Sequence, residues 1–362
     1  MERHRQGGRN PGNGMSNGGK SLVIRADASE QIGAGHIMRC LALSKAWQDS
    51  GGRVTFASAA MMPALEQRLQ NEGCEVVRLG TDVSSEQDME CSAALAEERV
   101  ADWVVVDGYG FGPPYHRALR QRNVRLLTMD DNGSLGEYCA DVILNPGAWA
   151  TEAIYVQREP HTRLLLGSQF VLLRPEFTCM ERKRDCSTSA RKLLVTMGAS
   201  DPENVTLRVL SAVVGVVDEG TEIRVVAGSG YRHLDELRTF AASVRQRVGV
   251  ESNPVNMAPL MAWADMAISA AGGTCWELAF MGTPSVLISI SQDQLENGKA
   301  AAERGIACNL GWHADVSSEA ISNAVQMLLH DGERRFAMCR AGQELVDGLG
   351  PKRVVNFLQS AQ

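Results

Sequence analysis

The chain of 362 residues is longer than one compact core usually allows, which predicts two domains. A hydrophobic fraction of 44% and a charged fraction of 22% are those of an ordinary globular protein. The net charge of −7 argues against a general nucleic-acid-binding protein, because such binding depends on lysine and arginine that neutralise phosphates. The nine cysteines form no CxxC pairs and no metal-ligand spacing with histidine, so we expect free thiols in a reducing cytoplasm.

The first segment, Met1 to Lys20, is rich in Gly, Asn and Arg and has almost nothing to bury. We therefore expect a disordered leader or a start-site artefact, and a start at Met15 would cost the fold nothing. No apolar run reaches the length of a bilayer span, and the N-terminus lacks the apolar core of a secretory signal. The expected location is the cytoplasm, away from membranes.

From Ser21 onward, short β-branched runs alternate with longer helical stretches, which is typical of a parallel sheet covered on both faces. The strands expected in the first half are 22–26, 53–57, 75–78, 103–107, 125–129 and 142–144. Helices are expected between them, for example at 37–48 and 62–71. Such sheets bind ligands beyond the carboxyl ends of their strands, where the loops 33–36, 107–109 and 129–132 would lie.

A less regular stretch from about Pro146 to Arg191 separates this half from a second alternation, and we place the interdomain connection at 161–190. The strands expected in the second half are 192–196, 222–227, 266–269, 285–289 and 306–309. The helices expected there lie near 203–216, 231–248, 259–263, 274–281, 294–304 and 317–329. This pattern predicts an α/β protein with two similar Rossmann-like domains, 21–160 and 191–348, a ligand-binding cleft between them, and a C-terminal helix in 349–362.

The segment Gly33-Ala34-Gly35-His36 stands where the first strand gives way to a helix. Glycine lets the backbone approach a ligand closely, and the first N–H groups of a helix, together with its dipole, favour an anion. The same potential disfavours a protonated imidazole, so His36 is expected to stay neutral near pH 7, as a general base must. The motif alone equally permits a tight turn without a ligand.

Two loops of the second half repeat this arrangement, because glycines follow a strand and precede a helix. The first is 196–201, which contains Gly198, and the second is 271–274. Their N–H groups could hold a phosphate, although Asp201 could equally be a plain helix cap.

Three polar residues follow on the next two helices. Glu277 could accept both hydroxyls of a ribose or merely interact favourably with the dipole of its helix. Gln294 and Asn297 are three apart, so they share a helix face that could reach a diphosphate or a sugar, or could simply be solvated.

These residues resemble a known family. The segments 269–274, 276–279 and 282–285 are similar to the nucleotide-sugar signature of GT-B proteins related to the glycosyltransferase that makes lipid II. Further segments resemble the UDP-sugar hydrolases of the pseudaminic-acid pathway, namely 25–29, 31–39, 107–110, Asp130-Asp131 and 197–201. The resemblance covers roughly Ser21 to Trp312 and implies a GT-B fold. It also implies hydrolysis of UDP-2,4-diacetamido-2,4,6-trideoxy-β-L-altropyranose to UDP and the free sugar.

The resemblance further implies where the substrate lies. UDP would bind mainly to the second domain, with Glu277 on the ribose and the Gly198 loop and the Gln294 and Asn297 region near the diphosphate. The sugar would project toward the first domain, where Gly33 and Gly35 are also expected to bind the substrate.

In the first domain, His36 would deprotonate the water that attacks the anomeric carbon. Asp107 and Tyr109 would help to position the sugar or the water, and Arg174 would contact the ligand from the connecting segment. Asp27 would orient His36 or bind a sugar hydroxyl. For Asp27 and Asp107, capping of nearby backbone is an equal alternative. One base and an anion cradle suffice for this reaction, so no metal or other cofactor is expected.

Two residues depart from the family pattern, since Ala199 replaces an expected second glycine and Gly108 replaces a bulkier residue beside the tyrosine. They leave the identity of the sugar open. A GT-B glycosyltransferase and a non-catalytic nucleotide-sugar-binding protein remain alternatives. A hydrolysing 2-epimerase is disfavoured, because its carboxylate pattern is missing from the first half. The expected partner is a UDP-linked diacetamido sugar, with no nucleic acid and no membrane, and the protein is expected to be a monomer.

Overall fold

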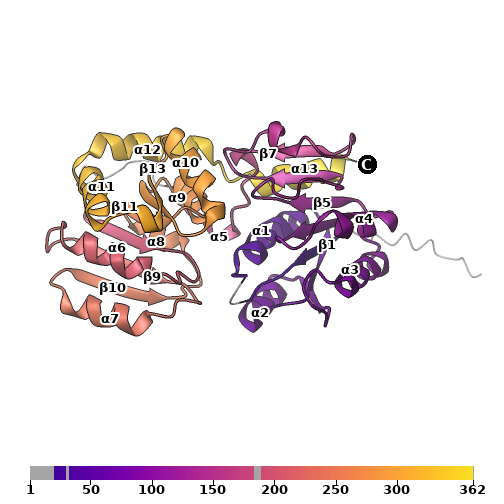
Figure 1. Ribbon diagram of the computed structural model, residues 1–362, viewed down its shortest axis with the longest axis horizontal. Coiled ribbons are helices and arrows are strands. Elements are labelled where there is room, and N and C mark those ends of the chain that lie inside the picture. The colour runs from indigo at the N-terminus through magenta and orange to yellow at the C-terminus, as the bar shows by residue number, and fades with distance from the viewer. Residues whose placement is uncertain (1–19, 30–31, 183–188, 362) are drawn as a thin grey trace, which may run out of the picture.

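The computed structural model describes residues 20–29, 32–182 and 189–361 of the chain. Two parallel sheets form two lobes that lie side by side (Figure 1). We call the part built on the first sheet the first lobe and the part built on the second sheet the second lobe. The leader expected at residues 1–20 falls, except for Lys20, outside the described residues.

The first lobe has a seven-stranded sheet in the order β3-β2-β1-β4-β5-β6-β7. Its strands are β1 (Ser21–Ala26), β2 (Arg53–Ser58), β3 (Glu75–Arg78), β4 (Trp103–Asp107), β5 (Leu126–Met129), β6 (Val142–Asn145) and β7 (Arg163–Leu166). The helices between its strands are α1 (Gly35–Asp49), α2 (Pro63–Asn71), α3 (Glu86–Glu98) and α4 (Pro113–Gln121).

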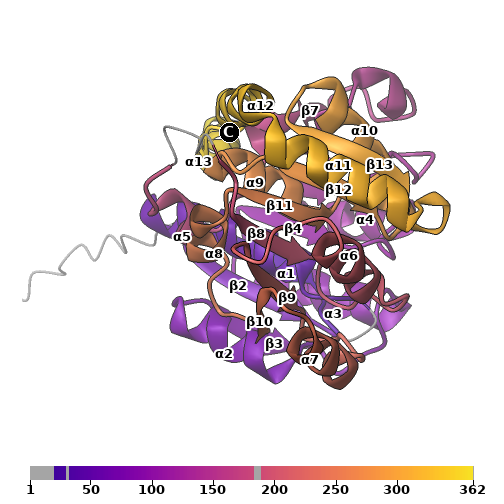
Figure 2. The same cartoon turned by 90° about the vertical axis from the view of Figure 1, so that its left-hand side faces the viewer.

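The second lobe has a six-stranded sheet in the order β10-β9-β8-β11-β12-β13, which repeats the order of the first six strands of the other lobe. Its strands are β8 (Lys192–Thr196), β9 (Glu222–Ala227), β10 (Arg247–Ser252), β11 (Met266–Ala270), β12 (Ser285–Ser289) and β13 (Ala307–Trp312). Its helices are α6 (Val205–Val214), α7 (Leu234–Ser243), α8 (Ala258–Trp263), α9 (Thr274–Met281), α10 (Leu295–Glu303), α11 (Ser318–His330) and α12 (Gly332–Leu345). Figure 2 looks onto this lobe and shows α6 and α11 packed together.

The central strands are apolar runs that are buried along their whole length, as expected for a sheet covered on both faces. In β1, all six residues are buried, and Leu22 and Ile24 face a core that they share with Trp47 of α1. In β11, Met266 and Ile268 contribute to the corresponding core of the second lobe. Each lobe therefore has its own hydrophobic core, and the loops at the strand ends can bind a ligand without being part of it.

Two expectations about the elements are wrong. The stretch 146–191 is more than a connection, because β7 lies within it and pairs in parallel with β6 at the edge of the first sheet. The helix expected at 231–248 ends early, since α7 stops at Ser243 and Arg247 opens the strand β10. Both strands lie at sheet edges and are only partly buried, so their sequences lack the continuous apolar run that marks a central strand.

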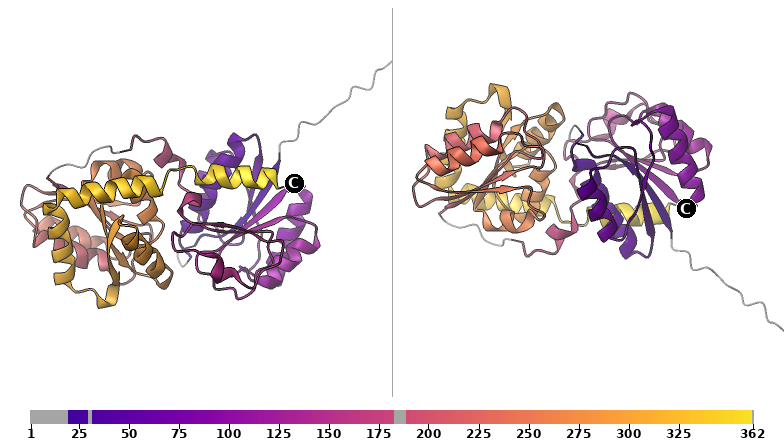
Figure 3. Two further views of the ribbon diagram at one scale, coloured as in Figure 1. Left: turned by 90° about the horizontal axis from the view of Figure 1, so that it is seen from above. Right: turned by 90° about the horizontal axis from the view of Figure 1, so that it is seen from below.

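The last helix, α13 (Gly350–Ser360), returns to the first lobe after the chain has completed the second. Val354 and Leu358 are buried in the first-lobe core, and the Trp103 indole donates to the Leu358 carbonyl at 2.9 Å. In Figure 3, α12 lies on one lobe and α13 on the other. The chain therefore crosses between the lobes twice, first through the segment around α5 (Pro175–Thr178) and then between α12 and α13.

Within the described ranges, no helix is both long and apolar enough to cross a membrane. Seven cysteines in those ranges are free thiols, as predicted, namely Cys40, Cys74, Cys91, Cys139, Cys179, Cys275 and Cys308. Cys186 lies outside the described residues.

Candidate active site

The candidate site is built around His36, the second residue of α1, and Asp107, the last residue of β4. Strands β1 and β4 are hydrogen-bonded neighbours, so the loop after β1 and the end of β4 meet at one edge of the sheet. His36 Nδ1 lies 2.7 Å from Asp107 Oδ1, and Asp107 is fully buried. Burial opposes the charge of this carboxyl, but Arg39 and His36 hold the pKa of Asp107 far below its usual range.

Asp107 therefore fixes the tautomer of the imidazole. An ionised carboxylate can only accept, so His36 Nδ1 donates its proton to Asp107. In the neutral ring, the lone pair is then on Nε2, which has no hydrogen-bond partner among the described residues. A histidine held in this way can take a proton from a water molecule or a hydroxyl group.

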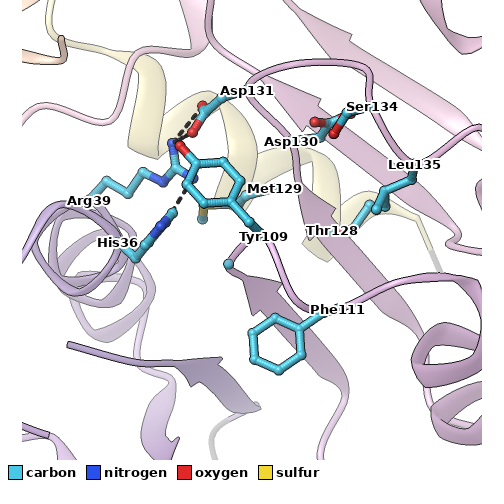
Figure 4. Close-up of a pocket in the computed structure, with 11 residues that line it drawn as sticks. His36, Arg39, Tyr109, Phe111, Thr128, Met129, Asp130, Asp131, Ser134 and Leu135 are labelled. Carbon is cyan, nitrogen blue, oxygen red and sulfur yellow. Dashed lines mark hydrogen bonds and ion pairs between the residues drawn. The ribbon is translucent and has the colours of Figure 1, made fainter. Parts of the chain in front are cut away.

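Arg39 completes the cluster from the next turn of α1. Its guanidinium donates to Asp107 through Nε at 2.7 Å and through Nη2 at 2.5 Å, and it donates through Nη1 to both oxygens of Asp131. Figure 4 shows Arg39 extended toward Asp131, beside His36. Asp131 follows β5, the strand next to β4, so three neighbouring strand ends supply this network.

The expectation that the helix dipole keeps His36 neutral is wrong in the direction of the pKa shift. Burial lowers the pKa of His36, but the carboxylate of Asp107 outweighs burial, so the net pKa is above the ordinary value. Arg39 opposes this rise. The imidazole is therefore a stronger base than a free histidine, and its neutral form predominates only above this raised pKa.

Tyr109 covers His36 from the loop after β4. The two rings meet edge to face with their centroids 5.1 Å apart (Figure 4). The phenol is still 60% exposed, so it lies over the histidine at the surface. Gly108 beside it has φ +153°, and a Cβ there would lie 2.8 Å from the Phe111 ring, so a larger residue would require this ring to move.

Two hollows adjoin this cluster. The first has an empty volume of about 330 Å³ and lies within the first lobe, where its lining includes His36, Arg39, Tyr109 and Asp131. The second has about 350 Å³ and lies between the lobes. Its first-lobe lining is Ser29, Gly33, Ala34 and Met62, and its second-lobe lining is Ala199, Ser200, Ser229 and Gly230. The chain therefore has a pocket between the lobes, and the predicted glycine loop before His36 faces the loop that follows Gly198.

The two facing loops differ at their helix ends. No described side chain caps the first turn of α1, whose N-terminal residue Gly35 is exposed. In the second lobe, Asp201 accepts from the backbone N–H groups of Val205 and Thr206 at 2.9 and 2.7 Å. The α6 terminus is thus already occupied by a carboxylate, as in the capping alternative for Asp201. Of these two helix ends, only that of α1 has its dipole free for a ligand.

Glu277 lies in the first turn of α9, whose N-terminus has no side-chain cap. Its Oε1 accepts from Arg174 Nη2 at 2.9 Å and from Arg174 Nε at 3.0 Å. Burial raises the pKa of Glu277, and Arg174 counteracts part of this rise. The structure therefore brings Arg174 and Glu277 together, and Glu277 Oε2 has no partner among the described residues.

Gln294 and Asn297 lie at the start of α10. The Gln294 amide oxygen accepts from the Ile290 backbone N–H at 3.0 Å, and its nitrogen lies beside Gly272, where a Cβ would be 3.4 Å away. Gln294 is thereby held against the loop that precedes α9. Asn297 is half-buried, and its side chain has no hydrogen bond among the described residues.

Asp27 does not contact His36. Its Oδ1 accepts from the backbone N–H groups of Ala59 and Ala60 at 2.8 and 2.9 Å, and its Oδ2 lies 2.8 Å from Arg25 Nη1. Arg25 is fully buried and also pairs with Asp88 through two hydrogen bonds. The structure thus gives Asp27 the backbone-capping role, and a contact with a sugar hydroxyl stays a prediction.

Arg39 and Asp131 are part of the motifs that the sequence offered, yet no role was assigned to either. The spacing contains a signal, since Arg39 is three residues after His36 and therefore on the same face of α1. A cation on the inward face of a helix needs a buried carboxylate, and the pair Asp130-Asp131 after a strand could have supplied it. Within the described ranges, no group of three or more His, Cys, Asp or Glu side chains is placed to hold a metal ion.

Comparisons with known proteins agree with this architecture. Residues 192–349 match the family model of the Glycosyltransferase family 28 C-terminal domain. The spore coat polysaccharide biosynthesis protein SpsG of Bacillus subtilis is 28% identical over 65% of this chain and 68% of its own length. The UDP-2,4-diacetamido-2,4,6-trideoxy-beta-L-altropyranose hydrolase of Campylobacter jejuni is 23% identical over 78% of this chain and 97% of its own.

Among solved structures, MurG of Acinetobacter baumannii superposes with a TM-score of 0.67 at 16% identity, covering 94% of this chain and 99% of that one. The spinosyn rhamnosyltransferase SpnG superposes with a TM-score of 0.62 at the same identity. Likeness at this level of identity shows the fold, and it confirms the predicted α/β class with two Rossmann-like units. The chain therefore has a GT-B fold, and the match to the Glycosyltransferase family 28 C-terminal domain falls on its second lobe.

Proposed function

We propose that this protein is an enzyme that acts on a nucleotide sugar, and that it hydrolyses UDP-2,4-diacetamido-2,4,6-trideoxy-β-L-altropyranose to UDP and the free sugar. The observation that carries the proposal is the His36–Asp107 pair, which lies beside a cleft and next to an uncapped helix terminus. The Campylobacter relative, which matches over almost its entire length, supports the choice of substrate. The reaction would belong to pseudaminic acid biosynthesis.

The mechanism follows from the geometry of the cluster. His36 Nε2 takes a proton from water while Asp107 holds the opposite ring nitrogen and stabilises the imidazolium that forms. The water oxygen forms a bond to the anomeric carbon, and the bond from that carbon to the diphosphate oxygen breaks with its electron pair going to UDP. Ala34, the residue before α1, lines the pocket between the lobes, and the N–H groups at the start of this helix would stabilise the leaving diphosphate there.

In this proposal, each lobe binds a different part of the ligand. Glu277 accepts the ribose hydroxyls, while the loop at Gly198 and the start of α10 at Gln294 and Asn297 lie near the diphosphate. Gly33 and Gly35 allow the close approach of the leaving group, and Tyr109 packs on the sugar above His36. Support comes from the pocket shared by Gly33 and Ala199, which brings the two loops to one ligand.

Product analysis tests the proposal. The purified protein is incubated with a small panel of UDP-linked diacetamido sugars, without any acceptor and with a chelator present. We expect UDP and free sugar in equal amounts from the altrose donor. Loss of turnover with retained UDP binding is expected for His36→Ala. Full activity of this variant would overturn the assignment of His36 as the base.

A second candidate is a glycosyltransferase that passes the sugar to an acceptor, which the family 28 match and the spore coat polysaccharide relative favour. Transfer would use the same base to deprotonate an acceptor hydroxyl. In that case UDP is released only when an acceptor is added. A non-catalytic nucleotide-sugar-binding protein would bind UDP in calorimetry and release none from any donor.

A further inference from the structure

Four charged side chains of alternating sign connect the first lobe to Glu277. Arg68 of α2 donates to Glu176 at 2.9 Å, and Glu176 lies 3.0 Å from Arg174. Arg174 in turn pairs with Glu277 of α9 at 2.9 Å. The middle pair, Arg174 and Glu176, is at the start of α5, in the segment that joins the lobes (Figure 1).

The surroundings of these residues hold the chain of charges in place. All four side chains are largely buried, with exposed fractions between 13 and 25%. Leu172 is buried in the core of the first lobe, while Phe177 packs into a cluster of the second lobe and lies 4.9 Å beneath the Arg174 guanidinium. Charge pairs at this depth are screened less than surface pairs, so their geometry has energetic weight.

In each of the two carboxylates, one oxygen accepts all the contacts with the arginines. Glu176 Oε1 accepts from both arginines, and Glu277 Oε1 accepts twice from Arg174. Arg174 is thus shared between two carboxylates. Its guanidinium holds Oε1 of Glu277, and Oε2 remains without a partner among the described residues. A carboxylate with one oxygen fixed and the other free is suited to accept hydrogen bonds from a diol.

We propose that Arg68, Glu176 and Arg174 are positioning residues that orient Glu277 for the nucleotide, and that they couple nucleotide binding in the second lobe to the placement of the first. The inference rests on the proposed function, in which Glu277 contacts the ribose. Arg174 then acts through Glu277 and does not itself bind the ligand. When Arg68 is removed, Arg174 becomes the remaining cation beside Glu176, which draws its guanidinium away from Glu277.

A double-mutant cycle tests this coupling, with UDP binding measured by calorimetry. Arg68→Met is expected to weaken UDP binding about fivefold, the lower range of a typical coupling between sites, and Glu277→Gln about tenfold. The double variant should bind UDP as weakly as Glu277→Gln alone, because Arg68 acts only through Glu277. Arg68→Lys should recover part of the affinity.

The matched control is Arg78→Met, which breaks the ion pair of Arg78 with Glu66, a neighbour of Arg68 on α2. It should leave UDP binding unchanged. Thermal unfolding is followed for each variant. If Arg68→Met does not fold, Glu176→Gln interrupts the same chain of charges one residue further on, and the same cycle with Glu277→Gln applies.

The outcomes separate this inference from the proposed function. Wild-type affinity in Arg68→Met, together with weak binding in Glu277→Gln, overturns the coupling alone. Additive losses in the double variant also overturn it, since Arg68 would then act elsewhere. Wild-type affinity in Glu277→Gln overturns both the ribose contact and the coupling. If the double-mutant cycle gives the expected affinities but no UDP is released from any UDP-sugar, only the proposed hydrolase activity is overturned.

Discussion

The two lobes share a strand order and differ at the loop that follows the first strand of each. After β1, the chain enters α1 without a side-chain cap and places His36 in the first turn. After β8, Asp201 folds back onto the N–H groups of α6. One topology thus yields a helix end open to an anion in one lobe and a closed one in the other. Strand order decides where a loop lies, and single residues decide what it does.

A second difference concerns charge. The first lobe concentrates acidic and basic side chains at its strand ends, where His36, Arg39 and Asp131 surround the buried Asp107. The pocket lining from the second lobe consists of small residues such as Ala199 and Gly230. Buried charges that face one another fix a geometry and shift pKa values, whereas small residues leave room for a ligand. This contrast supports the proposal that the first lobe does the chemistry and the second binds the nucleotide.

The largest effect is expected from His36→Gln, which keeps the size and polarity of the side chain but removes the base. The turnover number should fall by about 10²- to 10⁴-fold, the usual contribution of a general base, with UDP affinity unchanged. Steady-state kinetics beside calorimetry would measure both. The matched control is His161→Gln, on the surface beside Asp141, which should have wild-type kinetics.

Asp107→Asn is expected to have the next largest effect, a loss of about 10²-fold in turnover, because an amide no longer fixes the imidazole tautomer. The Asp107 charge raises the pKa of His36, and the base must be neutral, so activity falls as the pH drops through this pKa. Removing the charge lowers the pKa. The acid limb of kcat/KM against pH should therefore move to lower pH. An unmoved limb would mean that another group titrates.

Arg39→Gln should move the same limb in the opposite direction. Arg39 lowers the pKa of His36, so its removal raises that pKa further. Activity at pH values below the limb would then fall. Arg39→Lys should keep the limb near its wild-type place, since the charge remains. A downward shift in Arg39→Gln would contradict the assigned network.

The smallest effect is expected in the second lobe. Asp201→Asn weakens the cap of α6 and should cost about 1 kcal/mol in the free energy of unfolding, measured with a chemical denaturant. Asn tolerates the left-handed backbone that Asp201 adopts at φ +44°. UDP affinity should stay within a factor of two of wild type. A large loss of affinity would show that Asp201 serves a ligand and not the helix alone.

Much of the fold could be predicted from the sequence, because buried central strands such as Trp103–Asp107 are short apolar runs between turn signals. The edge strands β7 and β10 lack that run, and pairing with a neighbour decides their conformation. At the site, the loops and His36 were predictable from their place at strand ends. The direction of the His36 pKa was not, because it depends on Asp107, which lies 71 residues away in sequence. Equally, the pairing of Arg174 with Glu277 depends on how the two lobes are joined.

The central claim is that water, activated in the first lobe, attacks the anomeric carbon of a sugar whose nucleotide is held in the second. Turnover of the UDP-linked altrose in ¹⁸O-labelled water, with no acceptor and analysed by mass spectrometry, tests it most directly. The account predicts unlabelled UDP from the wild-type protein, since the bond from the anomeric carbon to oxygen breaks, and almost none from His36→Gln. Label in the UDP phosphate, or no UDP without an acceptor, would contradict it.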